Sequence, residues 1–214
     1  MTASGAAAFV GDDHWFDDGL YTSVTELAHR SPGPLDTAIS LWSAYGLALF
    51  GALLLAVWWR ARRPASGARD AAGPARAMLA LAAPVVVLAA FVVNSALKSL
   101  LREQRPCRTL HVVTVEACPA LGDWSLPSNH AVIAAAAATV LFFTDRRLAA
   151  LAVPAALLMA ASRVWVGAHY PHDVALGLAV GVLVSWPLMT AARRTAPLAG
   201  RLRETRLRPL VARR

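Results

Sequence analysis

Long uncharged apolar stretches dominate the chain and alternate with short segments that hold most of its charged residues. About 20 apolar residues span the hydrocarbon core of a bilayer, so these stretches predict membrane-crossing helices. The third stretch is rich in alanine, and small residues let neighbouring helices pack closely in a membrane. We therefore predict an all-α integral membrane bundle of about five transmembrane helices. The expected spans are Asp36–Trp59, Ala77–Leu101, Ser128–Thr144, Leu148–Ser162 and Asp173–Ala192.

The first 35 residues follow a different pattern. Apolar residues recur there at helical spacing and are followed by the helix-ending sequence Ser-Pro-Gly-Pro at 31–34. This pattern predicts an amphipathic helix that lies on the membrane interface, with a disordered leader as the alternative. The chain then divides into an N-terminal segment 1–35, a transmembrane domain 36–192 and an Arg-rich tail 193–214. The apolar positions of the first segment are Phe16, Leu20, Tyr21, Val24 and Leu27.

Composition supports a membrane protein and excludes several other classes. The 214 residues are 57% hydrophobic and only 16% charged, and the mean hydropathy is +0.49. These values exclude collagen-like, coiled-coil, disordered and disulfide-scaffold proteins. In a soluble chain the net charge of +8 would suggest nucleic acid as a partner. Because no basic stretch is interleaved with stacking aromatic residues, we predict no nucleic-acid binding.

The arginines predict the orientation of the chain in the membrane. They concentrate at 60–76, 146–147 and 193–214, three segments that fall on one side of the five expected spans. The positive-inside rule makes this side and the C-terminus cytoplasmic. The cations on the other, outer side oppose this rule, and a bound anion is the simplest reason for them. They are Lys98, Arg102, Arg105, Arg108 and Arg163.

The two cysteines, Cys107 and Cys118, both lie in the expected outer loop. An oxidising exterior and an even number of cysteines allow a disulfide between them, which would stabilise the fold by about 3 kcal/mol in the chain-entropy model. Two free thiols are the alternative. Zinc is not expected, because two cysteines without a matching pair of histidines make only half of a site.

Two polar segments on the outer side are candidates for an anion site. Seven residues, or nearly two helical turns, separate Lys98 from Arg105, so both can project from one face of a helix. Ser128 is a suitable N-cap for the third span, whose first backbone N–H groups, at Ser128 and Asn129, could then bind phosphate. His130 lies in the same turn. Each segment alone also has a simpler explanation. Lys98 and Arg105 could be cations at the membrane interface, and Ser128 and His130 could be a helix cap and an interfacial histidine.

The third polar segment holds a histidine and a carboxylate at helical spacing. His169 and Asp173 are four residues apart, so the carboxylate can accept a hydrogen bond from one ring nitrogen and leave the other as a nucleophile. Arg163 adds a cation. His172 has no carboxylate at this spacing, so we expect it to be interfacial. A purely structural His–Asp pair is the alternative. Together the three segments place two histidines, one aspartate and three cations on one membrane face.

These segments resemble the three-part signature of the type-2 phosphatidic acid phosphatase superfamily. Lys98–Pro106 matches K-x6-R-P, Pro127–His130 matches P-S-G-H and Ser162–Asp173 matches S-R-x5-H-x3-D, in the same order. The layout of residues 20–59 is also similar to that of bacterial undecaprenyl-diphosphatases of this superfamily. The chain departs from the signature at Asn129, where the pattern usually has Gly. That side chain adds bulk beside the phosphate and a possible hydrogen-bond donor.

The resemblance implies a membrane phosphatase that needs no metal and no other cofactor. His169, held by Asp173, would attack phosphorus and form a phosphohistidine. His130 would protonate the leaving oxygen and then activate the water that cleaves this intermediate. The groups that would hold the phosphate oxygens are Lys98, Arg105, Ser128, Asn129 and Arg163.

A site at the outer boundary of a bilayer suits a lipid phosphate. We expect a polyprenyl diphosphate, cleaved to the monophosphate and inorganic phosphate during recycling of the cell-wall carrier lipid at the bacterial cytoplasmic membrane. Phosphatidylglycerol phosphate, phosphatidate and a polyprenyl phosphoribose phosphate are alternative substrates. A vanadate-dependent peroxidase and a non-enzymatic lipid carrier are other readings. The carrier reading is disfavoured because the first, third and fourth expected spans contain no charged residue that could line a polar pathway.

Overall fold

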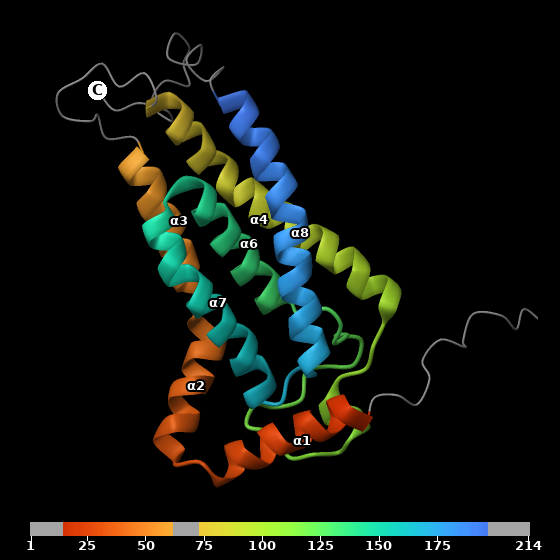
Figure 1. Cartoon of the computed structure of the whole chain (residues 1–214). Helices are drawn as coiled ribbons and strands as arrows, with labels where there is room; N and C mark the ends of the chain where they lie inside the picture. Colours follow the sequence, from red (N-terminus) through yellow and green to blue (C-terminus); the bar gives the residue numbers. More distant parts are fainter. Residues whose placement is uncertain (1–14, 62–72, 197–214) are drawn as a thin grey trace, which may run out of the picture.

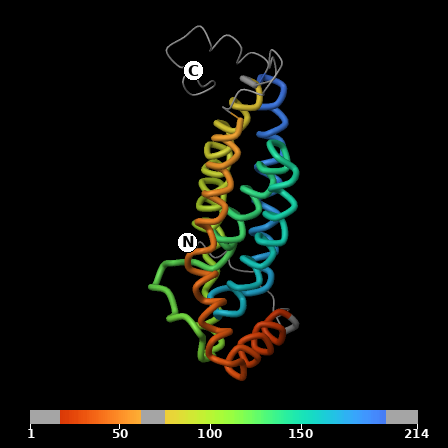
Figure 2. Tube along the Cα trace, turned by 90° about the vertical axis from the view of Figure 1, so that its left-hand side faces the viewer, coloured from red at the N-terminus to blue at the C-terminus, as the bar shows by residue number. Residues whose placement is uncertain are grey.

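The computed structural model describes residues 15–61 and 73–196, and these residues form an all-helical bundle without strands (Figure 1). Most of the long helices run alongside one another, and the first helix lies across one end of the bundle (Figure 2). We call this end the α1 end. The described helices are α1 (Trp15–Arg30), α2 (Gly33–Tyr45), α3 (Leu47–Ala61), α4 (Gly73–Leu101), α5 (Pro106–Thr109), α6 (Asn129–Thr144), α7 (Arg146–Trp165) and α8 (Pro171–Thr195).

The helices confirm an all-α membrane protein. Among the described residues, three helices are long and apolar enough to cross a bilayer, and the bent pair α2–α3 makes a fourth if it counts as one span. With 16 residues α6 is shorter than these, so a total of five spans stays a prediction. Large apolar side chains point away from the bundle along the long helices, as contact with lipid requires. They include Leu55, Val85, Leu88, Leu151, Leu158 and Leu183.

The first expected span is two helices rather than one. The chain bends by 50° between α2 and α3, at Gly46. A Cβ atom at Gly46 would lie 2.5 Å from the carbonyl oxygen of Trp42 and 2.7 Å from Cε of Met159 on α7. Hydropathy alone misses this bend, because apolar residues continue through both halves. The missing side chain lets α7 pack into the elbow of the bend.

The alanine-rich helix α6 is the centre of the bundle and packs against α3, α4, α7 and α8. Ten of its 16 residues are buried, among them a continuous run from Ala134 to Leu141. Two glycines of α8 allow the closest approach, because Cβ atoms at Gly177 and Gly181 would lie 2.8 Å and 2.6 Å from backbone oxygens of Ser128 and Val132. The first turn of α6 is thereby pressed against the start of α8, where the site residues lie.

Helix α1 is ordered, so the disordered-leader alternative is wrong for residues 15–30. It packs against α7 and α8, and the Tyr21 hydroxyl donates a 2.9 Å hydrogen bond to the carbonyl oxygen of Gly167. The inward face consists of Tyr21, Thr25 and Ala28, whereas Leu27 is 56% exposed. The predicted amphipathic face is therefore divided between the protein and the outside, and its contact with a membrane interface stays a prediction. The predicted stretches 1–14 and 197–214 lie outside the described residues, and α8 itself continues to Thr195.

Candidate active site

The imidazole of His169 is held by a buried carboxylate at the α1 end of the bundle. His169 lies in the turn between α7 and α8, and its Nδ1 is 3.2 Å from Oδ2 of Asp173, in the first turn of α8. The same oxygen accepts the backbone N–H of Tyr170 at 2.8 Å and the hydroxyl of Ser125. Asp173 and Ser125 are completely buried. Three donors therefore fix the plane of the carboxylate that orients His169.

The other nitrogen of His169 faces a cation. Its Nε2 lies 3.4 Å from Nη1 of Arg105. A guanidinium group can only donate hydrogen bonds, so Nε2 is the acceptor and the ring proton belongs on Nδ1, opposite Asp173. Burial lowers the pKa of His169 to about 4. The hydrogen bond and charge of Asp173 raise this pKa, whereas the charges of Arg105 and Arg163 lower it further. At neutral pH the imidazole is thus neutral, with a lone pair on Nε2 as a nucleophile needs.

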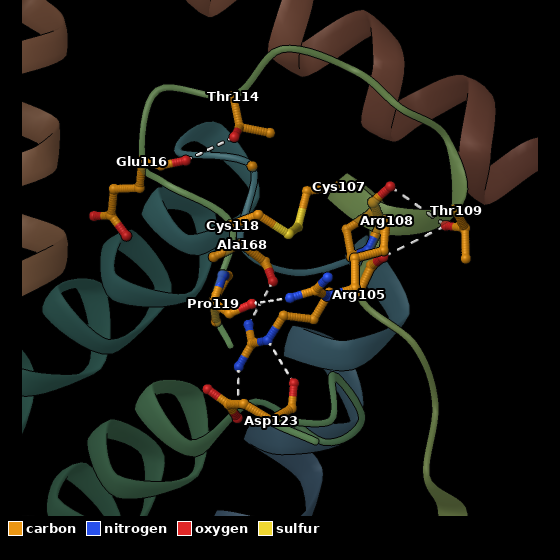
Figure 3. Close-up of a disulfide and its surroundings, with 12 residues drawn as sticks. Arg105, Cys107, Arg108, Thr109, Thr114, Glu116, Cys118, Pro119, Asp123 and Ala168 are labelled. Atoms are coloured by element: carbon orange, nitrogen blue, oxygen red, sulfur yellow. Dashed lines mark hydrogen bonds and ion pairs between the residues drawn. A yellow bond between two sulfur atoms is a disulfide. The ribbon is translucent and has the colours of Figure 1, made fainter. Parts of the chain in front are cut away.

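Beside His169, Arg105 and Lys98 meet Asp123 of the expected outer loop (residues 102–127). Arg105 precedes α5, is buried, and donates from Nη1 to the carbonyl oxygen of Ala168 at 2.7 Å (Figure 3). Its Nη2 lies 3.0 Å from Oδ1 of Asp123, and Lys98 Nζ lies 3.8 Å from the same oxygen. Burial raises the pKa of Asp123, but the hydrogen bond and charge of Arg105, with the charge of Lys98, lower it overall. Asp123 is therefore a carboxylate at neutral pH.

Arg163, in the last turn of α7, is the third buried cation. Its Nη1 donates to the hydroxyl of Ser43 on α2 and lies 3.3 Å from Oε2 of Glu116. Its Nε is buried and has no hydrogen-bond partner among the described residues. A buried donor without a partner costs free energy, so this nitrogen is a candidate contact for a ligand oxygen.

The start of α6 differs in one respect from the sequence expectation. Ser128 is the N-cap, but its backbone N–H donates to the carbonyl oxygen of Asp173 at 3.1 Å and so is not available to phosphate. The close packing of α6 on α8 at Gly177 brings these two backbones together. The Ser128 hydroxyl is buried and has no hydrogen-bond partner in the described part of the chain, so it is the group that Ser128 can offer to a phosphate oxygen. We therefore replace the predicted backbone contact of Ser128 with a contact through its side chain.

Asn129, the departure from the signature, is held from α4. Its Oδ1 accepts a 2.7 Å hydrogen bond from Nδ2 of Asn94, which is buried and also donates to the carbonyl oxygen of Pro127 at 3.3 Å. Asn94 stands one helical turn before Lys98. With its oxygen engaged, Asn129 presents its NH₂ group as a donor. His130 follows in the same turn and is within electrostatic range of His169, Lys98, Arg105 and Arg163.

A disulfide holds the outer loop against these residues. Cys107 in α5 is bonded to Cys118, with 6.0 Å between their Cα atoms (Figure 3). Near this bond, Arg108 donates to the carbonyl oxygen of Pro119 at 2.5 Å. The backbone N–H of Ser125 donates to the carbonyl oxygen of Glu103 at 2.8 Å. The loop that carries Glu116 and Asp123 is thus fastened on both sides of Asp123.

The structure therefore brings six predicted side chains together at one end of the bundle, although four helices, the turn before α8 and the segment before α5 supply them. A neutral imidazole faces a cluster of cations, and an anion such as phosphate is the natural counter-charge of such a cluster. The geometry suits nucleophilic attack on phosphorus. The six are Lys98, Arg105, His130, Arg163, His169 and Asp173.

Comparisons with known proteins identify the family. The sequence model of the PAP2 superfamily matches residues 79–196. The chain belongs to the PAP2 superfamily. It is 26% identical to the undecaprenyl-diphosphatase BcrC of Bacillus subtilis over 78% of this chain and 79% of that protein. It is 36% identical to the decaprenylphosphoryl-5-phosphoribose phosphatase of Mycobacterium tuberculosis over 72% of this chain and 77% of that protein.

A solved structure has the same fold. The PAP2-type phosphatidylglycerolphosphate phosphatase from Bacillus subtilis superposes with a TM-score of 0.60 and covers 88% of this chain and 90% of its own, at 17% sequence identity. The predicted membership of the PAP2 superfamily is confirmed by the family model.

In this PAP2 protein His172 is a connector between segments. Its Nε2 lies 2.7 Å from Oε1 of Glu103, its Nδ1 contacts Asp17 of α1, and its ring stacks on Tyr170 with 5.2 Å between centroids. Glu103, His172 and Asp173 also form a described group whose ligand atoms lie within 4.8 Å of one another, close enough for a metal ion. Metal independence of this PAP2 protein stays a prediction.

Several residues of the site were not identified from the sequence. Ser125, Asn94, Asp123 and Glu116 touch the predicted side chains but lie outside the three motifs. Ser125 and the two acids belong to an irregular loop, where no periodicity predicts which side chains turn inward. One signal was present for the acids, because a loop rich in unexpected cations requires counter-charges when no anion is bound.

Proposed function

We propose that this protein is a membrane lipid phosphatase that hydrolyses a polyprenyl diphosphate to the monophosphate and inorganic phosphate. The observation that carries the proposal is the arrangement around His169. Its proton-bearing nitrogen faces Asp173 at 3.2 Å and its free nitrogen faces Arg105 at 3.4 Å. A nucleophile and a positively charged pocket for the transferred group thus share one centre.

The reaction has two steps. In the first, Nε2 of His169 forms a bond to the terminal phosphorus, and the bond between this phosphorus and the bridging oxygen breaks. The lipid monophosphate leaves with a proton that His130 donates to its oxygen, and Asp173 stabilises the positive charge that develops on the ring. In the second step, His130 accepts a proton from water, whose oxygen attacks phosphorus, and the P–N bond breaks to release inorganic phosphate and restore His169.

The remaining site residues bind the transferred phosphoryl group. Lys98, Arg105 and Arg163 neutralise its non-bridging oxygens, as metal ions do in other phosphoryl-transfer enzymes. The Ser128 hydroxyl and the Asn129 amide add neutral donors. This scheme uses no metal. Unchanged turnover after removal of divalent ions with EDTA is the expected result, and recovery of activity on adding one divalent ion would contradict it.

The position of the site favours a lipid substrate. His130, His169 and Asp173 lie where helices of the apolar bundle begin, so a phosphate bound there would be at the boundary of the bilayer with its lipid tail along the helices. The proposed boundary is the outer face of the bacterial cytoplasmic membrane, with the C-terminus inside, as the arginine distribution predicts. The relative named for activity on undecaprenyl diphosphate supports the diphosphate as substrate.

A phosphatase acting on a polyprenyl phosphoribose phosphate is the second candidate. It is favoured by the 36% identity to the mycobacterial phosphatase with that name. Released phosphate should be measured with purified enzyme in detergent on both lipids, and on phosphatidylglycerol phosphate and phosphatidate. The candidate with the highest kcat/KM is the better assignment.

The decisive experiment compares the wild type with His169→Ala on a polyprenyl diphosphate labelled in its terminal phosphate. The wild type should release phosphate and carry label on the protein after an acid-free quench, and the variant should do neither. Label on the variant would remove His169 as the nucleophile. Intact lipid after incubation with the folded wild type would favour a non-enzymatic lipid carrier.

A further inference from the structure

The outer loop places two carboxylates on the cations that the mechanism assigns to phosphate. Asp123 Oδ1 lies 3.0 Å from Nη2 of Arg105 and 3.8 Å from Nζ of Lys98, and Glu116 Oε2 lies 3.3 Å from Nη1 of Arg163. Each of the three cations is buried, so each needs a negative partner when no substrate is bound. Carboxylate and phosphate oxygens present the same acceptor geometry to a guanidinium group.

We propose that Asp123 and Glu116 occupy the phosphate-binding positions of the resting enzyme and that the substrate phosphate displaces them. They form an acidic latch that sets the affinity of the site for phosphate. The inference rests on the proposed function for the role of the three cations. It adds two specificity-determining residues that belong to none of the three motifs.

The contacts of the loop allow this exchange. The side chains of Asp123 and Glu116 are 50% and 32% exposed, so either can turn to water without unfolding its surroundings. The disulfide at Cys118 and the backbone hydrogen bond of Ser125 fasten the loop on both sides of Asp123. The movement of Asp123 is therefore confined to the short segment between these two points, and its carboxylate stays close enough to return after phosphate leaves. Glu116 lies before this segment and is held by its own backbone N–H, which donates to the carbonyl oxygen of Val166 at 3.2 Å.

Charge gives the latch its effect on binding. An incoming phosphate carries negative charge, so it and Asp123 cannot both occupy the space between Lys98 and Arg105 without strong repulsion. Part of the free energy of phosphate binding is consumed in breaking the ion pairs of the latch. Replacing the carboxylate with its neutral amide keeps the shape and the hydrogen bond but removes the charge, and phosphate should then bind more tightly.

The test measures binding of inorganic phosphate and of orthovanadate, the probes used in place of the lipid. Asp123→Asn should tighten both about tenfold and Glu116→Gln about threefold, as expected for loss of one close charge pair. Glu26→Gln on α1 is the matched control and should change neither, because it removes an equally negative carboxylate that is exposed and pairs with Arg30 at 3.5 Å rather than with a site cation. Direct binding to a His169→Ala background makes the test independent of turnover.

Two outcomes would overturn the latch. Weaker or unchanged phosphate binding in Asp123→Asn would show that Asp123 only supports Arg105. An equal gain in Glu26→Gln would show a general effect of net charge. If the protein binds phosphate as described but cleaves no lipid, the proposed function fails and the latch stands, so the two failures are distinguishable.

A second observation lies at the opposite end of the bundle. A hollow of about 600 Å³ is lined by arginines from α4, α7 and α8 and by aromatic residues of α6 and α8. Phe142 and Trp186 stack with 5.6 Å between ring centroids, and the guanidinium carbon of Arg146 lies 5.0 Å from the centroid of Phe142. The described residues that line it include no carboxylate. Its charged and aromatic lining residues are Arg76, Phe142, Phe143, Arg146, Trp186 and Arg193.

The geometry points to a binding site for the head group of an anionic phospholipid in the leaflet opposite the active site. Twenty residues of helix separate Asp173 from Arg193, which is about 30 Å, the thickness of a hydrocarbon core. The hollow is therefore at the other membrane boundary. Arginines there attract an anionic head group, and the aromatic rings offer an apolar wall to the first part of its acyl chains.

The experiment compares two pairs of substitutions that change the net charge equally on the same two helices. The pair Arg146→Gln with Arg193→Gln should weaken binding of phosphatidylglycerol about tenfold, measured by native mass spectrometry against phosphatidylcholine. The pair Arg147→Gln with Arg194→Gln, at the neighbouring positions outside the hollow, should weaken it less than twofold. Equal losses in both pairs, or no preference for phosphatidylglycerol in the wild type, would refute the site. Competition by free glycerol phosphate would show that only the phosphate group is recognised.

Discussion

Ser125→Ala removes one of the three donors that fix the carboxylate of Asp173. The Ser125 hydroxyl donates to Oδ2 and also lies 3.3 Å from Nδ1 of His169, so it contacts both the carboxylate and the ring. Both Ser125 and Asp173 are completely buried, and water cannot replace the lost bond without opening the site. We therefore expect the ring of His169 to lose part of its alignment with the phosphorus that it attacks.

The magnitude follows from the bond that is lost. A buried hydrogen bond to a charged group contributes about 1.5–3 kcal/mol. If most of this difference appears in the transition state, where Asp173 stabilises a developing positive charge, kcat falls about 10- to 100-fold. The cations that bind phosphate are untouched, so KM should stay within about twofold. A role in folding alone would instead lower the amount of active enzyme and leave kcat per active site unchanged.

The assay is formation of the phosphoenzyme in a single turnover, normalised to active sites by orthovanadate binding. Ser125→Thr, which keeps the hydroxyl, should recover part of the rate. Ser23→Ala removes an exposed hydroxyl that bonds to the carbonyl oxygen of Gly19 at 2.7 Å on α1, and this control should have no effect. A normal rate in Ser125→Ala, or a higher KM with normal kcat, would refute the positioning role.

Three further predictions follow from the same geometry. His130→Ala should slow hydrolysis of a lipid phosphate monoester more than that of a lipid diphosphate, because a phosphate leaving group needs a proton less than an alkoxide does, and equal losses on the two substrates would contradict this role. Because burial lowers the pKa of His169 to about 4, phosphoenzyme formation should be independent of the protonation of His169 from pH 8 to about 5 and should fall tenfold per pH unit below 4, whereas a midpoint near 6.5 would indicate an exposed imidazole. Gly181→Ala puts a Cβ atom 2.6 Å from the carbonyl oxygen of Val132 and should lower the free energy of unfolding by about 1–3 kcal/mol, while Gly51→Ala, with nothing within 4 Å, should not, as thermal unfolding in detergent will show.

The parts of the site that the sequence could predict are those set by helix geometry within one segment. The spacing of His169 and Asp173 makes them neighbours at the start of a helix, and the structure places their side chains 3.2 Å apart. The expected N-cap at Ser128 also begins a helix there. The prediction that the backbone N–H of Ser128 is free to bind phosphate was wrong, because this group donates to the carbonyl oxygen of Asp173 on another helix. Periodicity along one segment contains no information about a partner so far away.

The fold shows the same division between local and distant information. The apolar stretches predicted helices well, since each is determined by its own composition. The bend at Gly46 was not predicted, because it depends on Met159 of α7, which packs where a side chain would otherwise stand. Similarly, the inward face of α1 includes Thr25 rather than Leu27. This face packs on the turn at Gly167 and not on lipid.

The acidic loop shows why the same limit applies to function. The motifs predicted cations at Lys98, Arg105 and Arg163. Their excess on the side that the positive-inside rule keeps poor in positive charge indicated a bound anion. A chain that folds before it meets substrate must neutralise such buried cations itself, and here Asp123 and Glu116 do so. A carboxylate of this kind needs only to reach the cations, so it can be supplied from many positions in a loop that is long enough. Their positions are therefore visible in the folded protein, while the need for them could be predicted from the unpaired cations of the sequence.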